Sequence, residues 1–154
     1  MNISLTLSFC FLEYFKKSII ILDKAMSIRT NISYGEFLDK LTILDIKSER
    51  IKDKEKVANI NHEREVLKDI WEKHGETGVD ISEEYEALKK INERLWEIED
   101  DIRDKERNKA FDAEFIELAR SVYVTNDERA RIKKVINHKL GSDLVEEKSY
   151  SDYQ

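Results

Sequence analysis

Apolar residues repeat along this chain with the period of an α-helix rather than that of a strand. In the first such stretch they fall mostly three or four positions apart, at Phe37, Leu38, Leu41, Leu44 and Ile51. A capping box precedes them, in which Ser33 accepts a hydrogen bond from the helix and Glu36 reaches back to the cap. The pattern predicts a first helix from Ser33 to about Lys52. A second helix should begin near Asp53 and end at Gly75, which suits a left-handed cap.

The second half of the chain is predicted to hold three more helices. A long helix over residues 82–107 carries a heptad-like apolar seam at Leu88, Ile91, Leu95, Ile98 and Ile102. A shorter helix over residues 111–123 should turn four side chains inward, Phe111, Phe115, Ala119 and Val122. A second capping box, Thr125 with Glu128, opens a last helix that stops at Gly141.

Composition agrees with an all-α fold. The chain has no proline, only four glycines and 39% charged residues, and so few helix breakers favour long helices. Its 154 residues suffice for one domain with one core. We therefore expect an all-α helical bundle of about five helices. The second and third helices, joined by a short loop over residues 75–80, should form a long antiparallel helix hairpin on which the C-terminal pair packs.

The first 25 residues differ from the rest because they are apolar nearly all round. They lack the basic start of a signal peptide, and before about 20 apolar residues have passed they are interrupted by Glu13, Lys16 and Lys17. We expect residues 1–25 to be a leader or start-site extension, with a helix packed on the domain or an interfacial membrane helix as alternatives. Residues 26–141 should form a single helical domain. Residues 142–154 should be a C-terminal tail, either docked or disordered.

Charge and cysteine content exclude several classes of protein. The formal net charge is -6 and the basic residues are interspersed with acids, so no basic stripe for a nucleic-acid partner is expected. Cys10 is the only cysteine, which excludes an intrachain disulfide and a multi-cysteine metal site. We expect a cytoplasmic protein with neither nucleic acid nor membrane as a partner.

A mixed aromatic and polar stripe on the long helix over residues 82–107 is the first half of a candidate ligand site. Projection at 100° per residue places beside the apolar seam Tyr85, Asn92, Trp96, Glu99 and Arg103. Glu99 and Arg103 are four positions apart, in the order that favours an ion pair. If the C-terminal helices fold back over Trp96, both halves would line a cleft for a small anionic or sugar-like ligand.

The second half of that site comes from the C-terminal helices. The last helix has one polar side, with Asn126, Arg129, Lys133 and Asn137, and Arg120 and Tyr123 come just before it. The candidate ligand-binding residues of both halves are Trp96, Glu99, Arg103, Arg120, Tyr123, Asn126, Arg129 and Lys133. The alternative is an ordinary second packing face with a structural Glu99–Arg103 ion pair.

Paired carboxylates suggest a metal site only as an alternative. The pairs Glu83 with Glu86 and Glu97 with Asp100 resemble those that hold Mg²⁺ in small all-α nucleotide pyrophosphohydrolases. They share one predicted helix, however, and Glu86 and Glu97 are about 16 Å apart along it, too far to share an ion. We expect no cofactor; the alternative is Mg²⁺ held by the set Glu36, Asp39, Glu83 and Glu86.

Four blocks of sequence resemble a family of short bacterial and phage proteins described as a domain of unknown function. The blocks are SYGEFLDKLTILDIKSERI, LWEIEDDIR, FIELARSVYVTNDERARIKKVIN and GSDLVEEKSY, within residues 33–150. The resemblance implies that the body of the chain is one domain, with the first 25 residues outside it, and it implies no particular activity. It also links the chain to cell-surface glycan contexts.

Two functional hypotheses follow. Signatures for a nucleophile, a base and a cofactor are absent from the sequence, which favours a non-enzymatic accessory or interaction module with a protein partner or self-association. The alternative is a small all-α enzyme or ligand-binding protein for an anionic or nucleotide- or sugar-like small molecule, with Mg²⁺ as the cofactor it would use.

Overall fold

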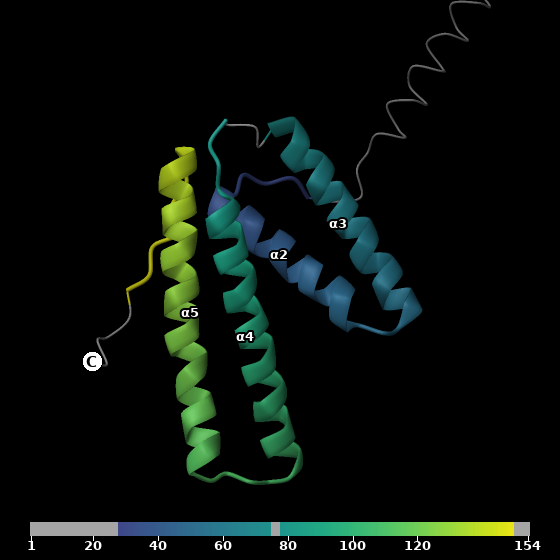
Figure 1. The fold of residues 1–154 in the computed structure, drawn as a ribbon, viewed down its shortest axis with the longest axis vertical. Helices are drawn as coiled ribbons and strands as arrows, with labels where there is room; N and C mark the ends of the chain where they lie inside the picture. The colour runs from purple at the N-terminus through teal and green to yellow at the C-terminus, as the bar shows by residue number, and fades with distance from the viewer. Residues whose placement is uncertain (1–27, 75–77, 150–154) are drawn as a thin grey trace, which may run out of the picture. The chain divides into compact units, whose positions relative to one another are not determined.

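The computed structural model describes residues 28–74 and 78–149, which contain helices and their connections and no strand. The helices are α2 (Tyr34–Arg50), α3 (Lys54–His74), α4 (Ser82–Arg107) and α5 (Ala113–Leu140). All four belong to one compact unit, Ile32–Gln154. The predicted all-α class is confirmed, with four helices in the described ranges where about five were expected (Figure 1). The predicted leader, residues 1–25, lies outside the described residues.

Local sequence signals set the ends of the first three helices. The side chain of Ser33 caps α2 by accepting a hydrogen bond of 3.2 Å from the Glu36 N–H, as the capping box predicts. The Asp53 carboxylate does the same for α3, accepting from the Lys56 N–H at 2.9 Å. Helix α4 has the bounds that its apolar seam predicted. The left-handed cap predicted at Gly75 lies outside the described residues.

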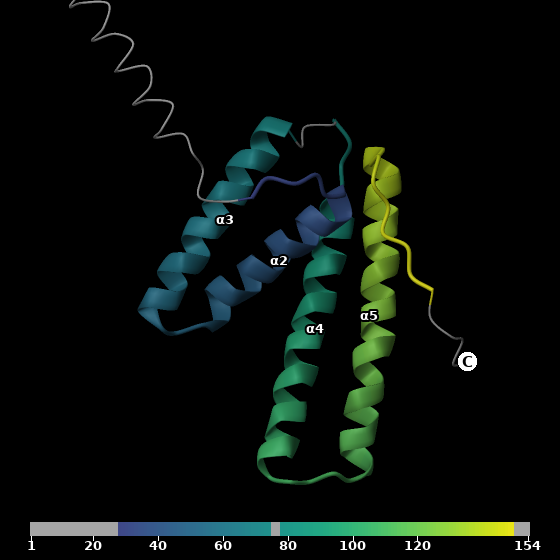
Figure 2. The ribbon, with the colours of Figure 1, turned by 180° about the vertical axis from the view of Figure 1, so that it is seen from behind.

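The long antiparallel hairpin is formed by α4 and α5, so its assignment to α3 and α4 was wrong. Figures 1 and 2 show α4 and α5 side by side and opposite in direction, joined by residues 108–112. Within the described ranges, α3 packs against α2 alone. Aromatic contacts hold α3 on α2. Trp71 of α3 stacks on Phe37 and meets Tyr34 edge-on, and both partners belong to α2.

Helix α5 is continuous from Ala113 to Leu140, so the predicted break into two helices at Thr125 was wrong. Thr125 lies in the middle of α5 and is fully buried. The N-cap of α5 is Asp112, which accepts a hydrogen bond of 3.0 Å from the Phe115 N–H. Phe111 was expected to face inward and is instead 56% exposed, because it precedes the helix at the tip of the hairpin. The stop at Gly141 is confirmed, since this residue adopts the left-handed conformation with φ 64°.

Helix α2 is the centre of the unit because it packs against α3, α4 and α5. The main core lies at its N-terminal half and contains Leu38, Leu41, Leu88, Ile136 and Leu140. A helix that is covered on more than one side buries polar as well as apolar positions, and α2 buries Asp39 and Thr42 on the side of α4. None of the described helices is both long enough and apolar enough to cross a membrane.

Candidate functional site

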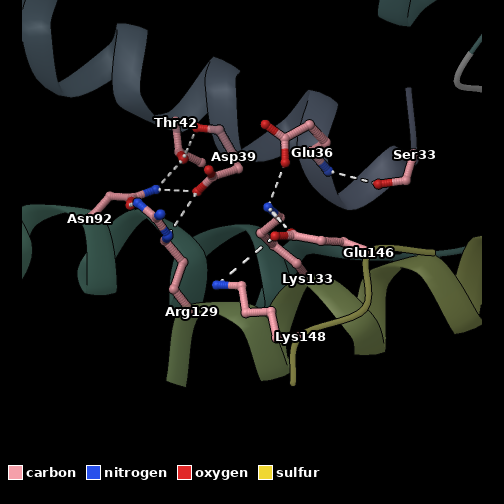
Figure 3. Close-up of polar contacts among 9 residues, drawn as sticks. All are labelled: Ser33, Glu36, Asp39, Thr42, Asn92, Arg129, Lys133, Glu146 and Lys148. Atoms are coloured by element: carbon pink, nitrogen blue, oxygen red, sulfur yellow. Dashed lines mark hydrogen bonds and ion pairs between the residues drawn. The ribbon is translucent and has the colours of Figure 1, made fainter. Parts of the chain in front are cut away.

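Polar side chains are buried where α2, α4 and α5 meet (Figure 3). The side-chain amide of Asn92 on α4 donates to the Asp39 carboxylate at 2.8 Å and to the Thr42 hydroxyl at 3.0 Å. The Thr42 hydroxyl in turn donates to the backbone carbonyl of Asp39 at 2.8 Å. All three residues are buried, so these bonds replace water that the groups lost on folding. The result is a fixed polar wall between α2 and α4.

The Arg129 side chain of α5 contacts this wall, but the wall does not use all of its N–H donors. Its Nε lies 3.9 Å from the Asp39 carboxylate, and its Nη1 donates to the Asn92 side-chain oxygen at 3.4 Å. Both distances exceed those of a tight two-pronged arginine–carboxylate pair. The guanidinium has five N–H donors and its side chain is 26% exposed. Asp39 and Asn92 therefore orient Arg129 and leave donors for another acceptor.

An open cleft of about 500 Å³ lies beside Arg129. Its walls come from three helices and consist of Ile43, Asn92, Leu95, Trp96, Glu99, Asp100, Arg103, Asn126 and Arg129. This volume lies within the usual range for small-molecule sites, about 300 to 1,000 Å³. Five of the eight residues proposed from the sequence thus line one cavity: Trp96, Glu99, Arg103, Asn126 and Arg129.

The other three proposed residues lie elsewhere. Arg120 is nine residues before Arg129 on the same continuous helix, a rotation of about 180°, so it lies on the opposite side and approaches Glu117 at 3.8 Å. Tyr123 is also rotated away, and it is partly exposed. Lys133 lies one turn beyond Arg129 and pairs with carboxylates of α2 and the tail.

Charges of both signs surround Trp96. Glu99 and Arg103 form the predicted ion pair at 2.8 Å, with both side chains largely exposed. The Arg50 guanidinium from α2 lies 6.0 Å from the centre of the Trp96 ring, at the outer limit of a cation–π contact. The Trp96 ring thus has one cation of α2 near it, and the Glu99–Arg103 pair keeps a donor and an acceptor on the rim of the cleft.

Lys133 is a buried cation that joins three segments. Only 6% of the residue is exposed, and its ammonium donates to Glu36 of α2 at 2.5 Å and to Glu146 of the tail at 2.8 Å. Burial works to lower the pKa of Lys133, but the hydrogen bonds to Glu146 and Glu36 outweigh it, so the pKa lies above its ordinary value. The hydrogen bond from Lys133 lowers the pKa of Glu146. The predicted reach of Glu36 to its own helix cap is replaced by this contact to Lys133.

Gly35 and Asn137 fix the approach of α2 to α5. The Gly35 N–H donates to the Asn137 side-chain oxygen at 2.6 Å, which satisfies a free donor of the first turn of α2. A Cβ at position 35 would lie 2.6 Å from the Lys133 carbonyl oxygen. Sequence reasoning missed this role, although a glycine two positions after a capping serine, where no turn is needed, was a usable signal.

The carboxylates of the alternative Mg²⁺ site do not form a common group. Glu36 is bound by Lys133, and Asp39 by Asn92. Over residues 28–74 and 78–149, no group of three or more His, Cys, Asp or Glu side chains is arranged to hold a metal ion. A second cleft, of about 800 Å³, is lined by Trp71 of α3 and Tyr85 of α4 among others.

A family model matches residues 28–153, a range that includes all four described helices. Its description is a family of unknown function (DUF6165). The chain belongs to this family. Comparison with curated proteins and with solved structures gives no match. The match confirms that the body of the chain belongs to a domain family of unknown function. The family description assigns no activity, so the roles of the cleft residues rest on their geometry.

Two buried threonines near the cleft give a matched test of the polar wall. The Thr125 hydroxyl is buried without a hydrogen-bond partner in the described part of the chain, whereas that of Thr42 has two. Thr125→Val should therefore stabilise the protein by about 1 kcal/mol, and Thr42→Val should destabilise it by about 1 to 2 kcal/mol. Urea unfolding followed by circular dichroism measures both; a destabilising Thr125→Val would mean that its hydroxyl has a partner.

Proposed function

We propose that this member of the DUF6165 family is a non-enzymatic binding module whose cleft holds a small anionic ligand. The observation that carries the proposal is the position of Arg129, which faces the cleft while its contacts to Asp39 and Asn92 are long. A carboxylate or phosphate group would supply the acceptor that this guanidinium lacks. The Asn126 amide, also on the cleft wall, would add a neutral donor.

The rest of the cleft suits the remainder of such a ligand. The face of Trp96 offers a flat apolar wall, and Glu99 and Asp100 offer acceptors for hydroxyl or amino groups. Among the residues that line the cleft there is no Ser, Thr, Cys, Lys or His, so only the carboxylates of Glu99 and Asp100 could act as a nucleophile or transfer a proton there. This composition favours recognition over covalent chemistry.

Preorganisation also supports a binding role. Asn92 contacts Asp39, Thr42 and Arg129, so the wall behind the cleft is fixed before any ligand enters. A site whose side chains are already ordered loses less conformational entropy on binding. The conformational entropy of orienting Arg129 is already lost on folding, because its partner Asn92 is 4% exposed and held by two helices.

Thermal melting of the full chain tests the proposal. The probes are inorganic phosphate, succinate, nucleoside monophosphates and nucleotide sugars, each with and without Mg²⁺. A ligand at about 100 times its Kd should raise the melting temperature by roughly 5 to 10 °C. Arg129→Gln should abolish the rise, because it removes the charge that binds the anion.

Arg120→Gln is the matched control, since Arg120 lies on the same helix and outside the cleft. It should leave the ligand-induced rise unchanged. A panel without any shift, or an equal shift in the Arg129→Gln variant, would contradict the proposed site. A shift that requires Mg²⁺ would instead support the Mg²⁺-dependent alternative.

A further inference from the structure

The C-terminal tail turns back along α5 after Gly141, as Figures 1 and 2 both show. Gly141 is the residue at which the chain reverses, because it adopts a left-handed conformation that glycine tolerates. Residues 142–149 form no helix or strand. The tail is therefore a short extended segment laid on a helix that the same chain provides.

Acidic side chains hold this tail in place. Glu146 accepts a hydrogen bond of 2.8 Å from Lys133, and Glu147 accepts one of 2.8 Å from Lys134. The apolar tail residues Leu144 and Val145 are about half exposed, at 46% and 51%. Charge complementarity, rather than burial of apolar surface, is thus what fixes the segment.

The surface under the tail offers lysine side chains that bind carboxylates. With the tail in place Lys133 is nine-tenths buried, and Glu36 contacts its ammonium from the α2 side, so one of its two carboxylate partners is independent of the tail (Figure 3). The positive charge of Arg129, on α5, also acts on the Glu146 carboxylate, whereas Lys148, 4.0 Å from Glu146, belongs to the tail itself. Lys134 is exposed and extends the cationic surface toward solvent.

We propose that Lys133 and Lys134 form a docking site for an acidic peptide segment of a partner protein, and that the chain's own tail occupies this site in cis. The tail has the pattern that the site recognises, two successive glutamates in an extended segment with apolar residues before them. A partner segment with such a pair competes with the tail. The tail sets the affinity, because a tethered segment acts as a competitor at an effective concentration of about millimolar.

Fluorescence anisotropy with a labelled synthetic peptide, SDLVEEKSY, tests the proposal on the full-length chain. The wild type should bind it weakly. A Glu146→Gln/Glu147→Gln variant, whose own tail has lost both carboxylates, should bind it at least about tenfold more tightly. A peptide with both glutamates replaced by glutamine should not bind either protein. Binding should weaken as salt is added, because Lys134 and Glu147 are exposed.

Lysine variants in the Glu146→Gln/Glu147→Gln background locate the site. Lys133→Gln should abolish peptide binding, and its melting curve checks that the chain still folds. Lys134→Gln, at an exposed position, should weaken binding several-fold without any effect on folding. Lys109→Gln is the matched control, because Lys109 is exposed at the far end of the α4–α5 hairpin.

Three kinds of result would overturn the proposal. The first is equal affinity of the wild type and the Glu146→Gln/Glu147→Gln variant for the peptide, or no binding by that variant up to about 1 mM. The second is an affinity that Lys134→Gln leaves unchanged. The third is a concentration-dependent dimer of the wild type that Lys134→Gln dissociates, since the tail of a second copy would then be the occupant instead of a partner protein.

Discussion

Replacing Gly35 by alanine should destabilise the protein by about 3 kcal/mol, although the same change inside an exposed helix would stabilise it by about 1 kcal/mol. The added Cβ would lie 2.6 Å from the Lys133 carbonyl oxygen and 3.0 Å from the Lys133 Cβ. Because the closest of these atoms is backbone of α5, the clash is relieved only if α2 moves away. That movement also breaks the 2.6 Å hydrogen bond from Gly35 to Asn137.

Urea unfolding followed by circular dichroism measures this loss, which corresponds to a melting temperature lower by roughly 10 °C. Gly78→Ala is the control, because a Cβ there meets nothing within 4 Å. It should cost only about 1 kcal/mol, from the positive φ of that residue. A neutral or stabilising Gly35→Ala would contradict the close packing of α2 on α5.

The second large effect is expected for Asn92→Asp. This change replaces an amide donor by a carboxylate, 2.8 Å from one oxygen of Asp39, and it also removes the donor to Thr42. With both carboxylates ionised, the variant should lose about 3 kcal/mol of stability, because Arg129, at 3.9 Å from Asp39, offsets only part of the repulsion. Protonation of either one relieves the repulsion and restores a donor between them. The deficit relative to the wild type should therefore shrink as the pH falls from about 8 to about 5.

Urea unfolding of wild type and variant at several pH values gives this difference directly. The control is Asn108→Asp, since Asn108 is exposed at the end of α4. Its effect should be small and should vary little over the same pH range. If Asn92→Asp is as stable as the wild type at about pH 8, Asn92 does not face Asp39 in solution.

The bounds of α3 and α4 were readable from the sequence, whereas the pairing of the helices was not. The bounds of α4 followed from one uninterrupted apolar seam, and those of α3 from Asp53 and the run of apolar residues after it. Periodicity says which face of a helix is apolar but not which helix covers it. Loop length favoured pairing α3 with α4, and the contact of Trp71 with Phe37 prevailed instead.

The error at Thr125 has a similar origin. A Thr-x-x-Glu pattern caps a helix when it stands at its start, but nothing between Val122 and Asp127 breaks a helix. In a continuous α5 the spacing along the sequence fixes the side on which each residue lies, so Arg120 cannot share a side with Arg129. The assumed break had freed Arg120 and Tyr123 to join the cleft.

Only part of the candidate site could be predicted from the sequence. The Trp96, Glu99 and Arg103 stripe follows from rotation along one helix, and these residues do line the cleft. The wall behind them was not found, because Asp39 was considered only as a member of the alternative Mg²⁺ site and Thr42 was not singled out. Their burial requires that α2 be covered by several helices, and that is a property of packing rather than of local pattern.

The most direct test of the cleft is a titration that reads Trp96 alone. The chain has two tryptophans, so Trp71→Phe leaves Trp96 as the only reporter. The phosphate- and carboxylate-bearing probes of the melting panel are added to this variant while its tryptophan emission is recorded. We predict a saturable change that Arg129→Gln abolishes and Arg120→Gln preserves. A probe that raises the melting temperature and leaves the Trp96 emission unchanged would contradict the account, because the ligand would then bind elsewhere.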